Sequence, residues 1–123
     1  MILLFEGSEK EKKGIRRLAN SLRVTVKEVK RSDYGQTLGF LCGSSGFARS
    51  APLRQPEALE QEMLVFSGLT NEQLDRFLEA YKASALPAIP LKAVVTLTNL
   101  KWTPLQLYAE LKKEDRSMHQ NNL

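Results

Sequence analysis

The stretch MLVFSGLTNEQLDRFLEAY, residues 63–81, decides the fold because it contains a strand, a turn and a capped helix in direct succession. Its first four residues are apolar, which is typical of a strand that is covered on both faces. Thr70 and Gln73 have the spacing of a capping box, so we expect a helix to begin after Thr70. The apolar residues of that helix recur at a spacing that makes one face: Leu74, Phe77, Leu78 and Tyr81.

The N-terminal half of the chain follows the same order. MILLF at residues 1–5 is another wholly apolar run, and Ser8 and Glu11 form another capping box. The helix predicted after Ser8 has an apolar stripe made of Ile15, Leu18, Ala19 and Leu22. Shorter runs follow each helix, VTVKEV at 24–29 and LKAVVT at 91–96, and their mixed polarity is typical of edge strands. The pattern therefore indicates an internal repeat.

These segments predict an α/β (α+β) fold. Two tandem β-α-β-α halves, residues 1–42 and 63–114, form one four-stranded, ferredoxin-like sheet with helices, in which the first and third strands are central. The alternative is a small doubly wound α/β sheet. A chain of 123 residues suggests a single domain over 1–123, with a Gly-, Ser- and Pro-rich connector at 43–62 and a flexible tail at 115–123.

The second helical segment of each half begins at a threonine. Thr103, Pro104 and Gln106 have the order of an N-cap, a first helical residue and the end of a capping box. Trp102, directly before this cap, is therefore predicted to anchor the helix and not to bind a ligand. Thr37 is the corresponding cap in the first half. If these segments leave one face of the sheet uncovered, that face would favour a homodimer.

The charge and the cysteine content limit the function. The net charge is +4, and residues 1–54 contain 11 Lys and Arg against 5 Asp and Glu. Such an excess attracts acidic partners or nucleic acid. The single cysteine rules out an internal disulfide, which favours a cytoplasmic location. No apolar run has the length of a membrane span, and the start of the chain is interpreted as a strand and not as a signal peptide.

Catalytic and metal-binding patterns are weak. Cys42 lies in FLCGSSG, but a cysteine nucleophile needs a nearby base, and the only histidine is His119 near the C-terminus. One Cys and one His so far apart have none of the spacing of a zinc site. We therefore predict no catalytic residue, no metal and no cofactor. An enzyme with Cys42 as its nucleophile is the second alternative to the main functional prediction below.

Residues Leu64–Tyr81 together with Leu91–Glu114 resemble a bacterial family called domain of unknown function 3783. The resemblance is carried by Phe66-Ser67-Gly68, Leu91-Lys92-Ala93-Val94, Thr98-Asn99 and Trp102-Thr103, and it is clearest over residues 63–114. It implies a small bacterial cytoplasmic domain. It assigns no catalytic residue to any position of this sequence.

The main functional prediction is a non-enzymatic binding or regulatory module for a small ligand or a protein partner. The predicted ligand site joins the two strand-to-helix turns with polar walls: Gly7, Ser8, Gly68, Thr70, Lys27, Lys92 and Asn99. The alternative is an RNA- or DNA-binding protein that uses the basic N-terminal half: Lys10, Lys12, Lys13, Arg16, Arg17, Lys30 and Arg31. Against this alternative, the aromatic signature of RNA-recognition motifs is absent.

Overall fold

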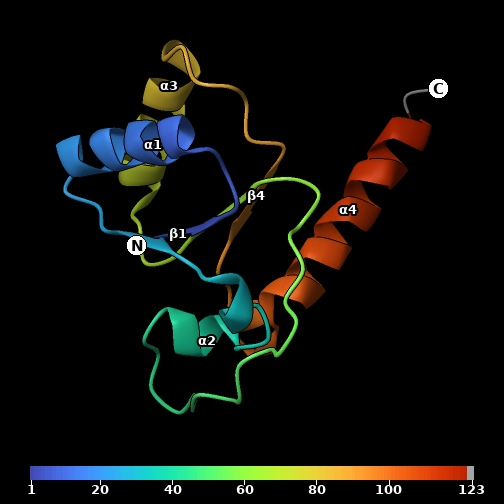
Figure 1. Ribbon diagram of the computed structural model, residues 1–123. Coiled ribbons are helices and arrows are strands. Elements are labelled where there is room, and N and C mark those ends of the chain that lie inside the picture. Colours follow the sequence, from blue (N-terminus) through green and yellow to red (C-terminus); the bar gives the residue numbers. More distant parts are fainter. Residues whose placement is uncertain (122–123) are drawn as a thin grey trace. The chain divides into compact units, whose positions relative to one another are not determined.

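The computed structural model describes residues 1–121 and contains four strands and four α-helices over this range (Figure 1). The elements in chain order are β1 (Ile2–Phe5), α1 (Glu9–Ser21), β2 (Val26–Glu28), α2 (Leu38–Leu41), β3 (Met63–Phe66), α3 (Asn71–Ala83), β4 (Leu91–Val94) and α4 (Pro104–Asn121). Two short 3₁₀ turns, η1 (Arg31–Asp33) and η2 (Asn99–Lys101), precede α2 and α4. All four predicted strands and both long predicted helices are thus confirmed.

The chain divides into two compact units, and each unit takes segments from both predicted halves. The first unit, residues 1–29 and 58–95, holds the strands with α1 and α3. The second unit, residues 30–57 and 96–123, holds the two 3₁₀ turns with α2 and α4. The predicted tail begins at residue 115. Helix α4 includes residues 115–121, and 122–123 lie outside the described residues.

The first unit is built on one sheet with the strand order β2-β1-β3-β4. The central strands β1 and β3 are antiparallel, with Ile2 opposite Phe66 and Phe5 opposite Met63. Each edge strand runs parallel to its central neighbour. The predicted α+β sheet with central first and third strands is confirmed. In this sheet the two strands of each β-α-β segment are direct neighbours. In the split β-α-β unit of ferredoxin-like domains, another strand lies between them.

Helices α1 and α3 cover one face of this sheet and pack against each other (Figure 1). Ile15 and Ala19 from α1 join Phe77 and Tyr81 from α3 over the side chains that alternate along the central strands. The rings of Phe66 and Phe77 meet edge to face, with centroids 5.7 Å apart. The alternate residues of both central strands are buried as well, as continuous apolar runs predict.

Local capping explains where the two long helices begin. The Oγ atom of Ser8 accepts from the Glu11 amide at 3.2 Å, and Oγ1 of Thr70 accepts from the Gln73 amide at 3.1 Å. Each third helical residue returns a bond to the cap's own amide. Both predicted capping boxes are therefore confirmed, and they fix the first helical turn of α1 and of α3.

The second unit is held by backbone bonds between segments that lie far apart in the sequence. The Leu38 amide, at the start of α2, donates to the carbonyl oxygen of Trp102 at 2.8 Å. Thr103 and Gln106 form the predicted capping box of α4, and Thr37 caps α2 through the Phe40 amide. Trp102 is half-buried and ends η2, so the prediction that it has a structural role at this junction agrees with its position.

The connector is mostly exposed, but the side chain of a buried residue outside it, Gln36, forms hydrogen bonds with its backbone. Gln36 is fully buried, and its amide group pairs with both backbone groups of Ser50 at 2.7 Å. Phe47 packs where Gly39 lacks a side chain, because a Cβ atom at Gly39 would lie 2.5 Å from the ring. None of the described helices combines the length and apolar character needed to cross a membrane.

Candidate functional site

The two strand-to-helix turns of the predicted ligand site lie at opposite ends of the sheet. Gly7 and Ser8 follow the C-terminal end of β1, whereas Gly68 and Thr70 follow the C-terminal end of β3. Because β1 and β3 are antiparallel, their C-terminal ends point in opposite directions. The structure therefore does not bring the two turns together.

Two of the three polar walls predicted for that site lie on different edges of the sheet. Lys27 pairs in register with Leu3 on one edge of the sheet, and Lys92 pairs with Leu64 on the other edge. Leu3 and Leu64 point to different faces, so the two lysines do as well. Asn99 belongs to the second unit, is 7% exposed, and accepts from the Thr96 amide at 2.8 Å. That bond gives Asn99 a role within its own turn.

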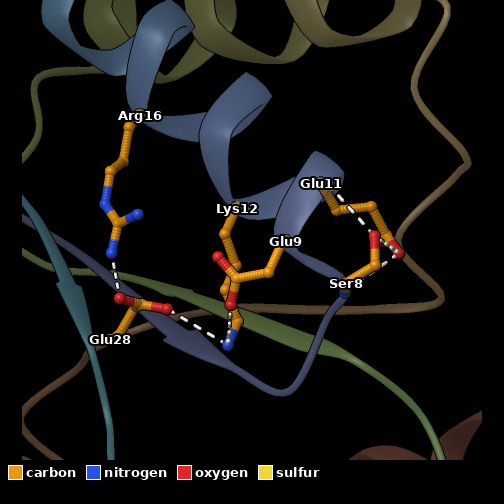
Figure 2. Close-up of polar contacts among 6 residues, drawn as sticks. All are labelled: Ser8, Glu9, Glu11, Lys12, Arg16 and Glu28. Carbon is orange, nitrogen blue, oxygen red and sulfur yellow. Dashed lines mark hydrogen bonds and ion pairs between the residues drawn. The ribbon is translucent and has the colours of Figure 1, made fainter.

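Two of the basic residues on α1 form ion pairs with one carboxylate on β2. Figure 2 shows Lys12 and Arg16 reaching from α1 to Glu28, and the Lys12 Nζ atom lies 3.2 Å from Glu28 Oε1. Partial burial opposes ionisation of Glu28, but the Lys12 hydrogen bond and the charges of Arg16 and Lys12 outweigh it and lower its pKa. Lys12 also lies 3.8 Å from Glu9. This arrangement neutralises much of the positive charge on that side of α1.

The other basic residues of α1 form a separate surface, which we call the basic stripe. Lys10, Lys13 and Arg17 are exposed and recur at i, i+3 and i+7, so they share one face of the helix. This face lies opposite the buried residues Ile15 and Ala19. The other predicted nucleic-acid contacts, Lys30 and Arg31, belong to the second unit.

Helix α3 carries acidic residues at the corresponding positions, which we call the acidic stripe. Glu72, Asp75 and Glu79 are exposed and have the same spacing. Counted from the N-caps Ser8 and Thr70, both stripes occupy the second, fifth and ninth residues. Glu72 pairs with Arg76 at 2.7 Å, and both side chains are more than 60% exposed.

A pair of carboxyl groups lies at the N-terminal turn of α1. Ser8 donates to Oε1 of Glu11 through its hydroxyl group at 3.0 Å and its amide at 3.3 Å. Glu11 is 7% exposed, and its other oxygen, Oε2, is buried and has no hydrogen-bond donor among the described residues unless the neighbouring Glu62 is protonated. Burial, the charge of Glu11 and a hydrogen bond between the two carboxyl groups raise the pKa of Glu62. Glu62 therefore keeps its proton to a higher pH than an ordinary glutamate does.

The same two carboxyl groups also affect the pKa of Tyr81 in α3. Its pKa is raised by burial and by the charges of Glu11 and Glu62, and its hydroxyl group donates to the carbonyl oxygen of Pro87. The sequence predicts the capping role of Glu11 but gives no signal for Glu62, which lies in the connector. Only the pairing of β1 with β3 brings Glu62 next to the turn that follows β1.

Cys42 is the C-cap of α2 and is half-buried, and its amide donates to the carbonyl oxygen of Leu38. The side chain of His119 lies outside the described residues. Within the part of the chain that the structure describes, no three His, Cys, Asp or Glu side chains lie close enough together to hold a metal ion.

Comparisons with known proteins bear on the C-terminal half. Neither a curated protein nor a solved structure gives a significant match to the sequence. The resemblance predicted for residues 63–114 is confirmed by a family model. Residues 62–118, which contain β3, α3, β4 and most of α4, match the family described as Domain of unknown function (DUF3783).

Proposed function

We propose that the protein is a non-enzymatic binding module that recognises a protein partner through the outer faces of α1 and α3. One observation carries this proposal: the two stripes have opposite charges at corresponding helical positions. The positions that build the fold are alike, since Ile15 and Phe77 are both buried and Glu11 and Gln73 both close capping boxes. The three exposed positions that form each stripe differ between the two helices in the sign of their charge.

Charge patterns of this kind favour recognition of another protein surface. Complementary charges steer association and fix the register of two proteins more than they increase affinity. The stripes lie on helices that a packed core holds in place, so little order has to be gained on binding. A nucleic acid would be attracted by the basic stripe but repelled by the acidic stripe on the neighbouring helix.

The proposal extends to origin and setting. The common order of strand, cap, helix and strand supports an internal repeat, in which two copies of one β-α-β unit acquired different surfaces. A bacterial cytoplasm is the proposed setting, supported by the family resemblance and by a single cysteine, Cys42.

Titration with charged probes, followed by amide chemical shifts in NMR, tests this function. We expect an oligoglutamate peptide to shift the amides of α1 around Lys13, and an oligolysine peptide to shift those of α3 around Asp75. A variant with Lys10→Glu, Lys13→Glu and Arg17→Glu should lose the first response and keep the second.

A single-stranded oligonucleotide is the third probe. Tighter binding of this probe than of oligoglutamate, with shifts that include Lys30 and Arg31, would favour the nucleic-acid alternative. Absence of shifts on both helices with every probe, in a chain that is monomeric, would overturn the proposed function.

A further inference from the structure

We infer that the partner is a second copy of this chain, and that the basic stripe of each copy pairs with the acidic stripe of the other. This inference rests on the proposed function and adds the identity of the partner. It concerns only the first unit, whose two long helices carry the stripes.

Both stripes belong to the same layer of the first unit. The buried residues of α1 and α3, such as Ile15 and Phe77, join one core on one face of the sheet. Lys13 and Asp75 lie on the opposite sides of their helices, so both stripes face away from the sheet. Since α1 and α3 also pack against each other, the layer presents a positive helix beside a negative one.

Such a layer is complementary to itself. In a two-fold dimer the same surface of both copies meets, and each contact occurs twice with the roles exchanged. A surface that is positive on one half and negative on the other satisfies this requirement, because the positive half of one copy meets the negative half of the other. The equal i, i+3, i+7 spacing of the two stripes allows three opposite pairs at each of the two helix contacts.

The ion pairs near the stripes do not block this pairing. Arg76 pairs with Glu72, but the Arg76 and Glu72 side chains are 64% and 71% exposed, and an exposed ion pair of this kind contributes little. The pairing with Glu28 holds Lys12 and Arg16 to the side of α1, and the basic stripe is separate from them. The association is therefore electrostatic, and we expect it to weaken as salt screens the charges.

Sedimentation velocity of the full chain over a concentration series tests this directly. We expect a monomer–dimer equilibrium whose dissociation constant rises at least about tenfold when the ionic strength increases from roughly 0.01 M to about 1 M. A chain that stays monomeric at low salt up to millimolar concentration would overturn the inference.

Charge-swapped variants test the pairing itself. One variant carries Lys10→Glu, Lys13→Glu and Arg17→Glu, and the other carries Glu72→Lys, Asp75→Lys and Glu79→Lys. Each alone has two stripes of one sign and should be monomeric, whereas an equimolar mixture should form a heterodimer. A single chain with all six substitutions should again form a homodimer.

The matched control carries Arg54→Glu, Lys101→Glu and Lys113→Glu. These residues are exposed in the second unit and change the net charge as much as reversal of the basic stripe does. The control should dimerise like the wild type. Dimerisation by either charge-swapped variant alone, or its loss in the control, would overturn the inference, and amide spectra confirm that each variant folds.

The outcomes separate this inference from the proposed function. If the wild-type chain stays monomeric while the charged peptides still shift α1 and α3, only the inference about the second copy fails. If the peptides leave both helices unchanged and the chain stays monomeric, the proposed function fails as well.

Discussion

At the scale of single residues, the carboxyl groups of Glu62 and Glu11 interact near the start of α1. Oε1 of Glu11 is engaged by Ser8, and its buried Oε2 has no donor among the described residues unless Glu62 carries a proton. A buried acceptor without a donor is costly, so we expect a proton on Glu62 to stabilise the fold. The pair links the cap of α1 to the start of β3.

The stability of the protein should depend on pH through Glu62. Its pKa is raised in the folded state, so the folded protein binds this proton more readily than the unfolded chain. The stability gained from the proton is fully present below the unfolded pKa of 4.5 and is lost as the pH rises through the raised value. Glu62→Gln keeps a donor for Glu11 at every pH, so the variant should be more stable than the wild type at neutral pH.

Urea unfolding at several pH values measures this difference. The advantage of Glu62→Gln should shrink as the pH falls towards 4.5. Glu60→Gln is the matched control, because Glu60 is exposed and its substitution changes the charge equally. Equal stability of wild type and Glu62→Gln at every pH would show that the two carboxyl groups do not share a proton.

At the scale of elements, capping explains why so much of the fold is readable from the sequence. The capping boxes at Ser8, Thr70 and Thr103 all form, because each depends on residues three positions apart. The bond between Gln36 and Ser50 and the contact between Glu11 and Glu62 were not predicted. They depend on segments that only the folded chain brings together.

Loss of the Thr70 cap should destabilise the protein. In Thr70→Ala the Gln73 amide loses its acceptor at the start of α3, which should cost about 1 kcal/mol in the free energy of unfolding. Thr70→Ser keeps a hydroxyl group and should lose much less. Denaturant titrations of the three proteins make the comparison, and equal losses in both variants would assign the effect to packing of the threonine methyl group.

At the scale of the whole molecule, the strand order explains why the predicted ligand site does not assemble. The sequence predicts which strands are central, because a fully apolar run differs from an alternating one. It does not predict the direction of β3 relative to β1, since side-chain patterns are the same for both directions. The antiparallel pairing of β1 and β3 separates Gly7 from Gly68. The ligand site that was predicted from the similarity of the two turns therefore does not form.

The same strand order predicts that neither half of the chain folds alone. A fragment of residues 1–54 contains only β1 and β2, and a fragment of residues 55–123 contains only β3 and β4. Two strands rarely form a stable sheet without further partners. We expect each fragment to lack a dispersed amide spectrum, and their mixture to recover the spectrum of the intact chain.

Leu4→Asp in the shorter fragment is the control, because Leu4 is buried in the central strand β1 and an unpaired charge there should prevent complementation. A dispersed spectrum from either unmixed fragment would contradict the prediction and show that one half contains a complete folding unit.

Both outer strands carry a lysine within their short pairing segment, Lys27 in β2 and Lys92 in β4. An outer strand presents backbone groups that can recruit a strand from another molecule, and lysine opposes this by holding a charge at the growing edge. We therefore expect the two residues that were predicted to line a ligand site to oppose association between the sheet edges of different molecules.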